Sequence, residues 1–245
     1  MIKTKSRFLE LSKRYKFLKK FYFFYNINIR NRKFLKNNSQ LGEEKYILDG
    51  FPKNYVGKYL DLGCYHPTKH NNTYLMNKKG WSGINIDLNP LSIELFNYHR
   101  PNDINLNIGI SNKETTKNLY FIDELNTQNT LDKNQLLFLK NHHNIKKNEI
   151  KKKKIKTKKL MSVLKKYKFY QIDFMNIDIE GHELEVLKTI DFKKIKIKYL
   201  CIEMINHNKT AINNSNKIKN LLKKNNFNLI KKIKYNFIYK SIKSK

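Results

Sequence analysis

Three acids and a histidine gather within six positions of the stretch "NIDIEGHELEVLK", residues 176–188. They are Asp178, Glu180, His182 and Glu183. Asp178 falls inside a predicted apolar strand, where an unpaired charge is costly, and capping of the next helix does not explain it. A carboxylate or a neutral imidazole can take a proton from a hydroxyl nucleophile. We therefore predict Asp178, Glu180 and His182 as catalytic, and Glu183 is the member that helix capping explains most easily.

The same region offers ligands for a divalent cation. Asp178, Glu180, Glu203 and His207 carry oxygen and imidazole donors that Mg²⁺ or a transition ion accepts. Because these residues fall on separate elements, their spacing cannot establish a metal site. We favour a metal-free site and keep the divalent metal as the alternative.

The surrounding pattern alternates strands with helices. Helices are predicted at 89–96, 160–167, 182–190 and 216–225, and residues 228–243 form two strands around a turn at Tyr235 and Asn236. Further strands are predicted at 56–63, 81–87, 104–110, 169–180 and 195–205. This order predicts an α/β fold with a mostly parallel sheet, helices on both faces and a C-terminal antiparallel hairpin. The lysine-dense part of 124–160 is predicted as a loop or an edge strand.

Acids recur at the predicted strand ends, as Asp61, Asp87, Asp178 and Glu203. Parallel sheets bind ligands beyond the carboxyl ends of their strands, so these acids predict a functional cleft. Asp87 is placed to accept hydrogen bonds from the two hydroxyls of a ribose, although it could instead cap the following helix.

The turn "DLGCYHP", residues 61–67, has one glycine, Gly63. The fingerprint G-x-G-x-x-G of dinucleotide-binding proteins is absent, so a pyrophosphate would lack its cradle. A cofactor without phosphate needs only one such glycine.

The ordered segments "DLGCYHP", "NNTYLMNKKGWSGINIDLNP", "RPNDINLNIGIS", "IDFMNIDIEGHELEVLK" and "IEMIN" resemble the FkbM family of S-adenosylmethionine-dependent methyltransferases. The resemblance implies a Rossmann-like class I methyltransferase sheet, S-adenosylmethionine as cofactor and a hydroxylated acceptor. It implies that Asp87 holds the ribose. Asp103 is a further candidate for cofactor binding, although it could instead cap the third strand. The other cofactor-binding candidates that it implies are Asp61, Gly63 and Cys64 at the methionine end, Asn72 and Thr73 after the first turn, and Asn107 and Ile108 near the adenine.

We therefore predict an O-methyltransferase acting on a hydroxyl of a small molecule, most readily a sugar or glycan. Two alternatives stay open: a nucleic-acid methyltransferase, and a non-enzymatic module on the same fold that binds anionic surfaces. They are motivated by the net charge of +31, from 51 Lys+Arg against 20 Asp+Glu. Arginine, which suits bidentate phosphate contacts, is rare, and the lysine and asparagine bias is typical of an AT-rich genome. We therefore do not favour a nucleic-acid partner, and the oligomeric state is left open.

Residues 1–40 are predicted as a basic amphipathic extension of a methyltransferase domain at 41–245. Its apolar stripe consists of Leu11, Tyr15, Leu18, Tyr22 and Tyr25. Such a helix could contact a membrane surface, but we favour packing on its own domain. The two cysteines are isolated, and no apolar run approaches the ~20 residues of a membrane span. A cytoplasmic location is therefore expected.

Overall fold

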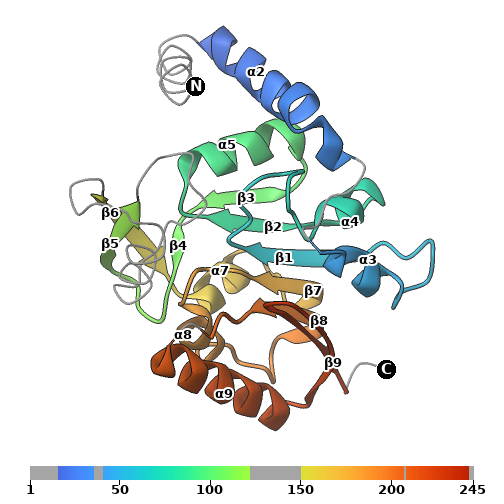
Figure 1. Ribbon diagram of the computed structural model, residues 1–245, viewed down its shortest axis with the longest axis vertical. Helices are drawn as coiled ribbons and strands as arrows, with labels where there is room; N and C mark the ends of the chain where they lie inside the picture. The colour runs from blue at the N-terminus through green and yellow to red at the C-terminus, as the bar shows by residue number, and fades with distance from the viewer. Residues whose placement is uncertain (1–15, 36–40, 122–149, 207, 243–245) are drawn as a thin grey trace.

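The computed structural model describes residues 16–35, 41–121, 150–206 and 208–242 (Figure 1). Its central sheet has seven strands in the order β3-β2-β1-β7-β8-β10-β9. They are β1 (Lys58–Leu62), β2 (Ser82–Asp87), β3 (Ile104–Asn107), β7 (Gln171–Ile177), β8 (Lys196–Glu203), β9 (Phe227–Ile233) and β10 (Asn236–Ser241). Neighbours run parallel from β3 to β8, whereas β10 runs antiparallel to both β8 and β9. The predicted parallel sheet with a C-terminal antiparallel hairpin is confirmed.

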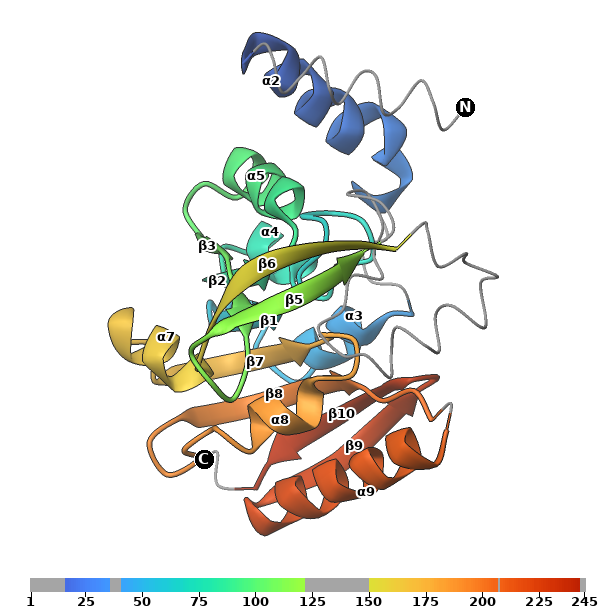
Figure 2. The ribbon, with the colours of Figure 1, turned by 90° about the vertical axis from the view of Figure 1, so that its left-hand side faces the viewer.

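Helices cover both faces of this sheet. Successive residues of each strand point to opposite sides, so apolar side chains on both faces need to be covered. On one face, Leu60 and Leu62 pack in the core with side chains of α7 (Leu160–Lys166), α8 (Glu183–Leu187) and α9 (Lys209–Lys224). On the other face, Tyr59 packs with side chains of α3 (Glu43–Leu48) and α4 (Tyr74–Lys78). Figure 2 shows α9 running beside β9 at the hairpin end of the sheet.

α5 (Pro90–His99) begins as the sequence predicts. Asn89 is its N-cap, with its side chain accepting a hydrogen bond from Leu91 N, and Pro90 occupies the first turn.

A second, smaller sheet has the order β4-β6-β5. It contains β4 (Gly109–Ile110), β5 (Thr116–Phe121) and β6 (Lys151–Lys158). The lysine-dense stretch thus forms a strand, paired antiparallel with β5. The strand predicted at 104–110 is corrected: it divides at Ile108 into β3 and β4, which belong to different sheets.

Two predicted boundaries also change. β7 ends at Ile177, so Asp178 and Glu180 lie in the loop after the strand and not on it. The hairpin turn lies at Lys234 and Tyr235, one residue earlier than predicted, and Lys234 has the positive φ of 51° that such a turn uses.

The N-terminal segment packs on α5 (Figure 1). α2 (Lys16–Phe24) continues into the π-helix η1 (Tyr25–Arg30), and a 3₁₀ turn, η2 (Arg32–Leu35), follows. Tyr22, Phe23 and Ile27 pack against leucines of α5. Packing on the domain is therefore confirmed for this part, but the predicted stripe is wrong at Tyr25, which is exposed. Asn26, four residues after Tyr22, lies beside it instead and donates from Nδ2 to the Tyr22 hydroxyl at 3.2 Å.

Leu11, Tyr15 and the predicted boundary at residue 40 lie outside the described residues, so the two-part organisation stays a prediction. No helix in the described part of the chain is long and apolar enough to cross a membrane.

Candidate active site

The loops after β1 and β7 cross at Gly63. Asp178 N donates to Leu62 O at 2.9 Å, and Gly63 N donates to Ile86 O at 2.9 Å. A Cβ on Gly63 would lie 1.7 Å from the Asp178 carbonyl oxygen, and the φ of Gly63 is +79°. Glycine is therefore required here by the approach of another backbone segment. This contact fixes Asp178 against the end of β1.

Asp61 lies at the same crossing and is fully buried. One carboxylate oxygen accepts from Thr73 Oγ1 at 3.0 Å and from Asn71 Nδ2 at 3.1 Å, and the other accepts from Asn176 Nδ2 at 2.9 Å. Burial raises its pKa, and the hydrogen bond from Asn176 opposes that shift. The carboxylate thus joins β1, β7 and the loop between β1 and α4, and its predicted contact with a cofactor stays a prediction. Asn72 extends the network, because its Nδ2 donates to Asn176 Oδ1 at 3.0 Å.

Arg100 anchors the other side of this network and was not predicted. Its side chain is 2% exposed. It donates to Asn71 Oδ1 at 2.7 Å, to Thr73 Oγ1 at 2.9 Å and to the Pro67 carbonyl. Asn71 and Thr73 therefore bridge the buried Arg100 cation to the Asp61 carboxylate, which compensates both charges.

Asp87 ends β2 and is half-buried. Its Oδ2 accepts from Tyr65 N at 2.8 Å and its Oδ1 from Asn89 N at 2.7 Å. Burial raises its pKa to about 6, against the lowering effect of these backbone amides. The Leu88 amide acts on the same carboxylate, whose remaining acceptor capacity could take hydrogen bonds from ligand hydroxyls. The geometry fits the predicted ribose role, which stays a prediction. Asn89, and not Asp87, is the N-cap of α5, and Asp87 accepts from the amide of that cap residue.

Asn107 is the last residue of β3 and pairs with Asp87, and Ile108 follows it. Asn107 is exposed, and its Nδ2 donates to the Asp87 carbonyl at 3.0 Å. Ile108 is partly buried against the core. Their predicted contact with an adenine is not tested by these contacts.

Cys64 and Asp103 have their contacts within the fold, and their predicted contacts with a cofactor stay predictions. The Cys64 side chain is 2% exposed and packs with Ile93 and Phe96 of α5, and burial raises the pKa of its thiol. Asp103 directly precedes β3 and so lies at the amino end of the parallel strands, opposite to the predicted cleft. It accepts from Tyr59 Oη and from Gly83 N. Both side chains therefore stabilise the fold where they lie.

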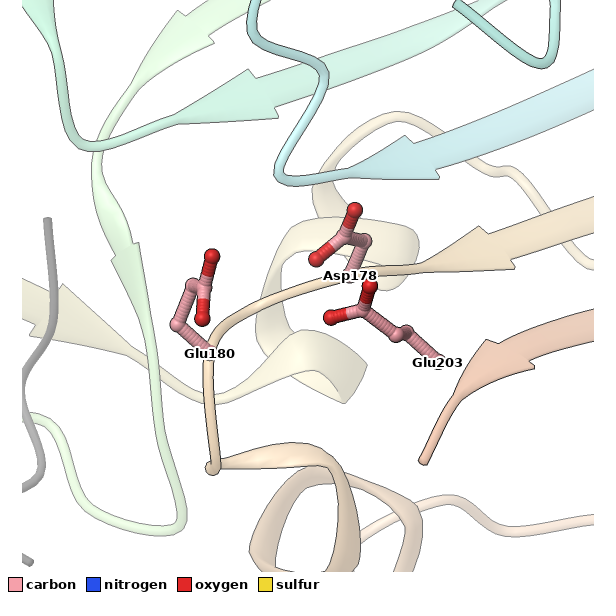
Figure 3. Close-up of side chains that lie close together, drawn as sticks. All are labelled: Asp178, Glu180 and Glu203. Carbon is pink, nitrogen blue, oxygen red and sulfur yellow. The ribbon is translucent and has the colours of Figure 1, made fainter. Parts of the chain in front are cut away.

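Three carboxylates meet beyond the ends of β7 and β8 (Figure 3). Asp178, Glu180 and Glu203 each offer an oxygen within 4.8 Å of the others. Glu180 adopts a φ of +52° and Gly181 a φ of +95°, which turns the chain sharply after Asp178. The structure therefore joins the two predicted catalytic acids to Glu203.

Asp178 and Glu203 are hydrogen-bonded to one another. Burial raises the pKa of both carboxyl groups. The negative charge of Asp61 raises the pKa of Asp178 further, and the negative charge of Asp178 raises that of Glu203. The pair therefore holds a proton above the usual range of a carboxylic acid, with Glu203 as the donor.

His182 and Glu183 have other contacts. Glu183 Oε1 accepts from Gly181 N at 3.0 Å and Ile179 N at 3.2 Å, so it holds the turn that precedes α8, and its capping of the helix itself stays a prediction. His182 Nε2 lies 3.3 Å from Lys117 Nζ on β5 and 3.5 Å from Glu185 Oε2 on α8. His182 is therefore not one of the residues that meet at the carboxylate cluster, and its catalytic role stays a prediction. His207 lies outside the described residues.

A pocket of about 90 Å³ opens beside the cluster. Glu180, Glu183 and Glu203 line one side, and the first turns of α9 line the other, with Thr210, Asn214 and Ser215. The pocket combines carboxylates with neutral hydroxyl and amide groups, a set that can hydrogen-bond a polyol.

Residues 61–229 match the family model of the methyltransferase FkbM domain. The chain belongs to the FkbM methyltransferase family. The FkbM domain runs from β1 into β9 and so includes Asp61, Asp87 and the three carboxylates. No curated protein matches the chain. The family predicted from the sequence is confirmed.

Proposed function

We propose that this FkbM-family chain is an S-adenosylmethionine-dependent O-methyltransferase that acts on a hydroxyl of a sugar or glycan. The observation that carries the proposal is the position of Asp87 and the carboxylate cluster at the carboxyl ends of neighbouring parallel strands. Ligands of parallel α/β sheets bind at this edge. The strand order, which changes direction at β1, supports a Rossmann-like class I sheet.

Asp87 is the residue best suited to hold S-adenosylmethionine. Backbone amides fix its carboxylate, and the remaining lone pairs can accept from the two ribose hydroxyls. The single turn at Gly63 supports a cofactor without phosphate groups. When bound, S-adenosylmethionine supplies an electrophilic methyl group.

Asp178 is the proposed general base. A hydroxyl is a weak nucleophile while protonated, and a carboxylate within hydrogen-bond reach can accept its proton. The raised pKa of Asp178, about 6, makes it a stronger base than an ordinary aspartate while leaving it ionised at neutral pH. Glu203, as the protonated partner, orients the Asp178 carboxylate. The pocket beside Glu180 would hold the body of the acceptor; Asp178 does not line it, so the reacting hydroxyl would have to extend from the pocket toward Asp178.

A divalent cation is the alternative for the same cluster. Three carboxylates within 4.8 Å of one another form a donor set that suits Mg²⁺. A cation would lower the pKa of the acceptor hydroxyl and make a base less important. Methyl transfer that persists in excess chelator supports the base, whereas transfer that stops and returns with Mg²⁺ supports the cation.

The proposal is tested by incubating the full chain with isotope-labelled S-adenosylmethionine and a panel of glycans, and reading the products by mass spectrometry. The expected result is label on a glycan hydroxyl, lost in Asp178→Asn and kept in Asp49→Asn, an exposed acid after α3. Label on nucleic acid would instead support the nucleic-acid methyltransferase. Cofactor binding without transfer to any acceptor class would support the non-enzymatic module. We also propose a cytoplasmic location, which the two free, buried cysteines support.

A further inference from the structure

A second pocket lies between the N-terminal segment and the loop after β1. It measures about 60 Å³. Its walls come from α2 and η1, from the loop that contains Tyr65 and Lys69, and from the first turns of α5. Asp87 does not line it, so it adjoins the proposed ribose site and is not the same site.

The lining of this pocket is positively charged. Arg30 and Lys69 both line it, and none of its described lining residues is acidic. The nearby Asp87 carboxylate lies behind the wall, where it accepts from the backbone amides of Tyr65 and Asn89. Arg30 has no ion pair in the described ranges of the chain. The half-buried Lys69 has a lowered pKa, first because of burial and then because of the positive charge of Arg30. Two cations that repel one another across a pocket favour an anion between them.

Two further groups add to this preference. α5 has ten residues, and its N-terminal turn contributes Asn89, Leu91 and Ser92 to the pocket, so the positive end of its dipole faces it. The Tyr65 hydroxyl lies 3.5 Å from Lys69 Nζ. Burial raises the pKa of Tyr65, so its hydroxyl keeps its proton at neutral pH and can donate.

His66 makes the pocket a preformed one. Its Nδ1 accepts from Thr68 N at 3.1 Å and from Lys69 N at 3.0 Å, so the ring proton lies on Nε2. Nε2 donates to Asn26 Oδ1 at 2.9 Å. Burial lowers the pKa of His66 to about 3, which keeps the ring neutral. This hydrogen bond links η1 directly to the loop that carries Lys69.

We propose that this pocket binds a phosphate-type oxyanion between Arg30, Lys69 and the first turn of α5. The guanidinium of arginine matches the paired oxygens of a phosphate, and helix N-termini favour the same group. The oxyanion can belong to a soluble sugar phosphate or to an anionic lipid headgroup. Phe21 and Phe24 on α2 are 66% and 50% exposed, so a membrane surface is included as a source.

The test uses the full chain without S-adenosylmethionine. Calorimetry compares glucose 1-phosphate with glucose, and sedimentation compares phosphatidylcholine vesicles with and without phosphatidic acid. The pocket variant is Arg30→Ala with Lys69→Ala. The charge-matched control is Lys193→Ala with Lys217→Ala, two exposed lysines outside the pocket.

We expect one phosphate probe to bind, and its affinity to fall at least about tenfold in the pocket variant and to stay within about twofold in the control. A loss with glucose 1-phosphate identifies a soluble source, and a loss with phosphatidic acid alone identifies a headgroup. Equal binding by wild type and pocket variant, equal losses in both variants, or binding of neither probe overturns the proposal. Because no methyl donor is present, these outcomes do not bear on the proposed methyl transfer.

Discussion

Asp178 and Glu203 form a hydrogen-bonded carboxyl pair at the ends of the adjacent parallel strands β7 and β8. Such a pair costs free energy when both members are ionised. It persists because the backbone fixes it: Asp178 is bonded to Leu62 O and abuts Gly63. Raised pKa values at strand ends are typical of functional sites, where chemistry and not stability sets the environment.

Replacement of Asp178 by asparagine should abolish most turnover. Loss of a general base costs typically ~10²–10⁴-fold in rate, and affinity for S-adenosylmethionine should be unchanged. In wild type, kcat/KM should fall as the pH drops below about 6, because protonated Asp178 cannot accept a proton. Steady-state kinetics of both proteins across pH 5–9 check this. Full activity of Asp178→Asn at pH 7 would exclude Asp178 as the base.

The same substitution should stabilise the fold at high pH. The pKa of Asp178 in the folded protein is about 6, above its ordinary value of 3.8. The folded state therefore favours the protonated form, and this contribution is lost as the pH rises through about 6. Asp178→Asn should raise the free energy of unfolding by roughly 1–3 kcal/mol at pH 8 and by less at pH 5. Urea unfolding at the two pH values measures it; equal effects at both would contradict the raised pKa.

Gly63→Ala should prevent stable folding. The new methyl group would overlap the Asp178 carbonyl oxygen and also occupy a left-handed backbone position. We expect a loss above about 4 kcal/mol. Gly80→Ala is the matched control, because Gly80 has a φ of +86° and a methyl group added there would meet no atom within 4 Å. It should cost only about 1 kcal/mol. Similar unfolding midpoints for the two variants would show that the loops do not cross as described.

Arg100→Lys should lose both stability and cofactor affinity. A lysine cannot reproduce the forked contacts to Asn71, Thr73 and Pro67, and it leaves the buried Asp61 poorly compensated. The expected loss of stability is about 3–5 kcal/mol. Arg32→Lys, on the exposed turn η2, should change neither quantity. The measurements are thermal unfolding and S-adenosylmethionine binding. If Arg100→Lys keeps the stability and the cofactor affinity of wild type, the Arg100 network does not hold the loop after β1.

Hydrophobic patterns predict the strands of this protein well, because parallel strands are buried on both faces. These patterns do not predict where a strand ends when the chain turns at a residue other than glycine. "NIDIE" continues the apolar alternation of β7, yet Glu180 adopts a left-handed φ that its residue type does not signal. The acids consequently meet as a cluster through a loop, and Glu203 joins them from β8.

Side-chain networks are harder to predict than strands. The position of Asp61 at the end of β1 indicates a ligand contact, but its partners come from two distant places in the chain: Asn71 and Thr73 from the loop after β1, and Asn176 from β7. Arg100 carries one signal: it is the only arginine after Arg32 in a chain that otherwise uses lysine. An arginine in that setting indicates a need for the guanidinium fork.

Binding of S-adenosylmethionine, measured by calorimetry, tests the central claim most directly. Wild type and Asp49→Ala should bind it equally, and Asp87→Ala should bind it about 10–100-fold more weakly, because two ribose hydrogen bonds to a charged group are lost. Failure of wild type to bind, or unchanged affinity in Asp87→Ala, would contradict the proposed cofactor site at the end of β2.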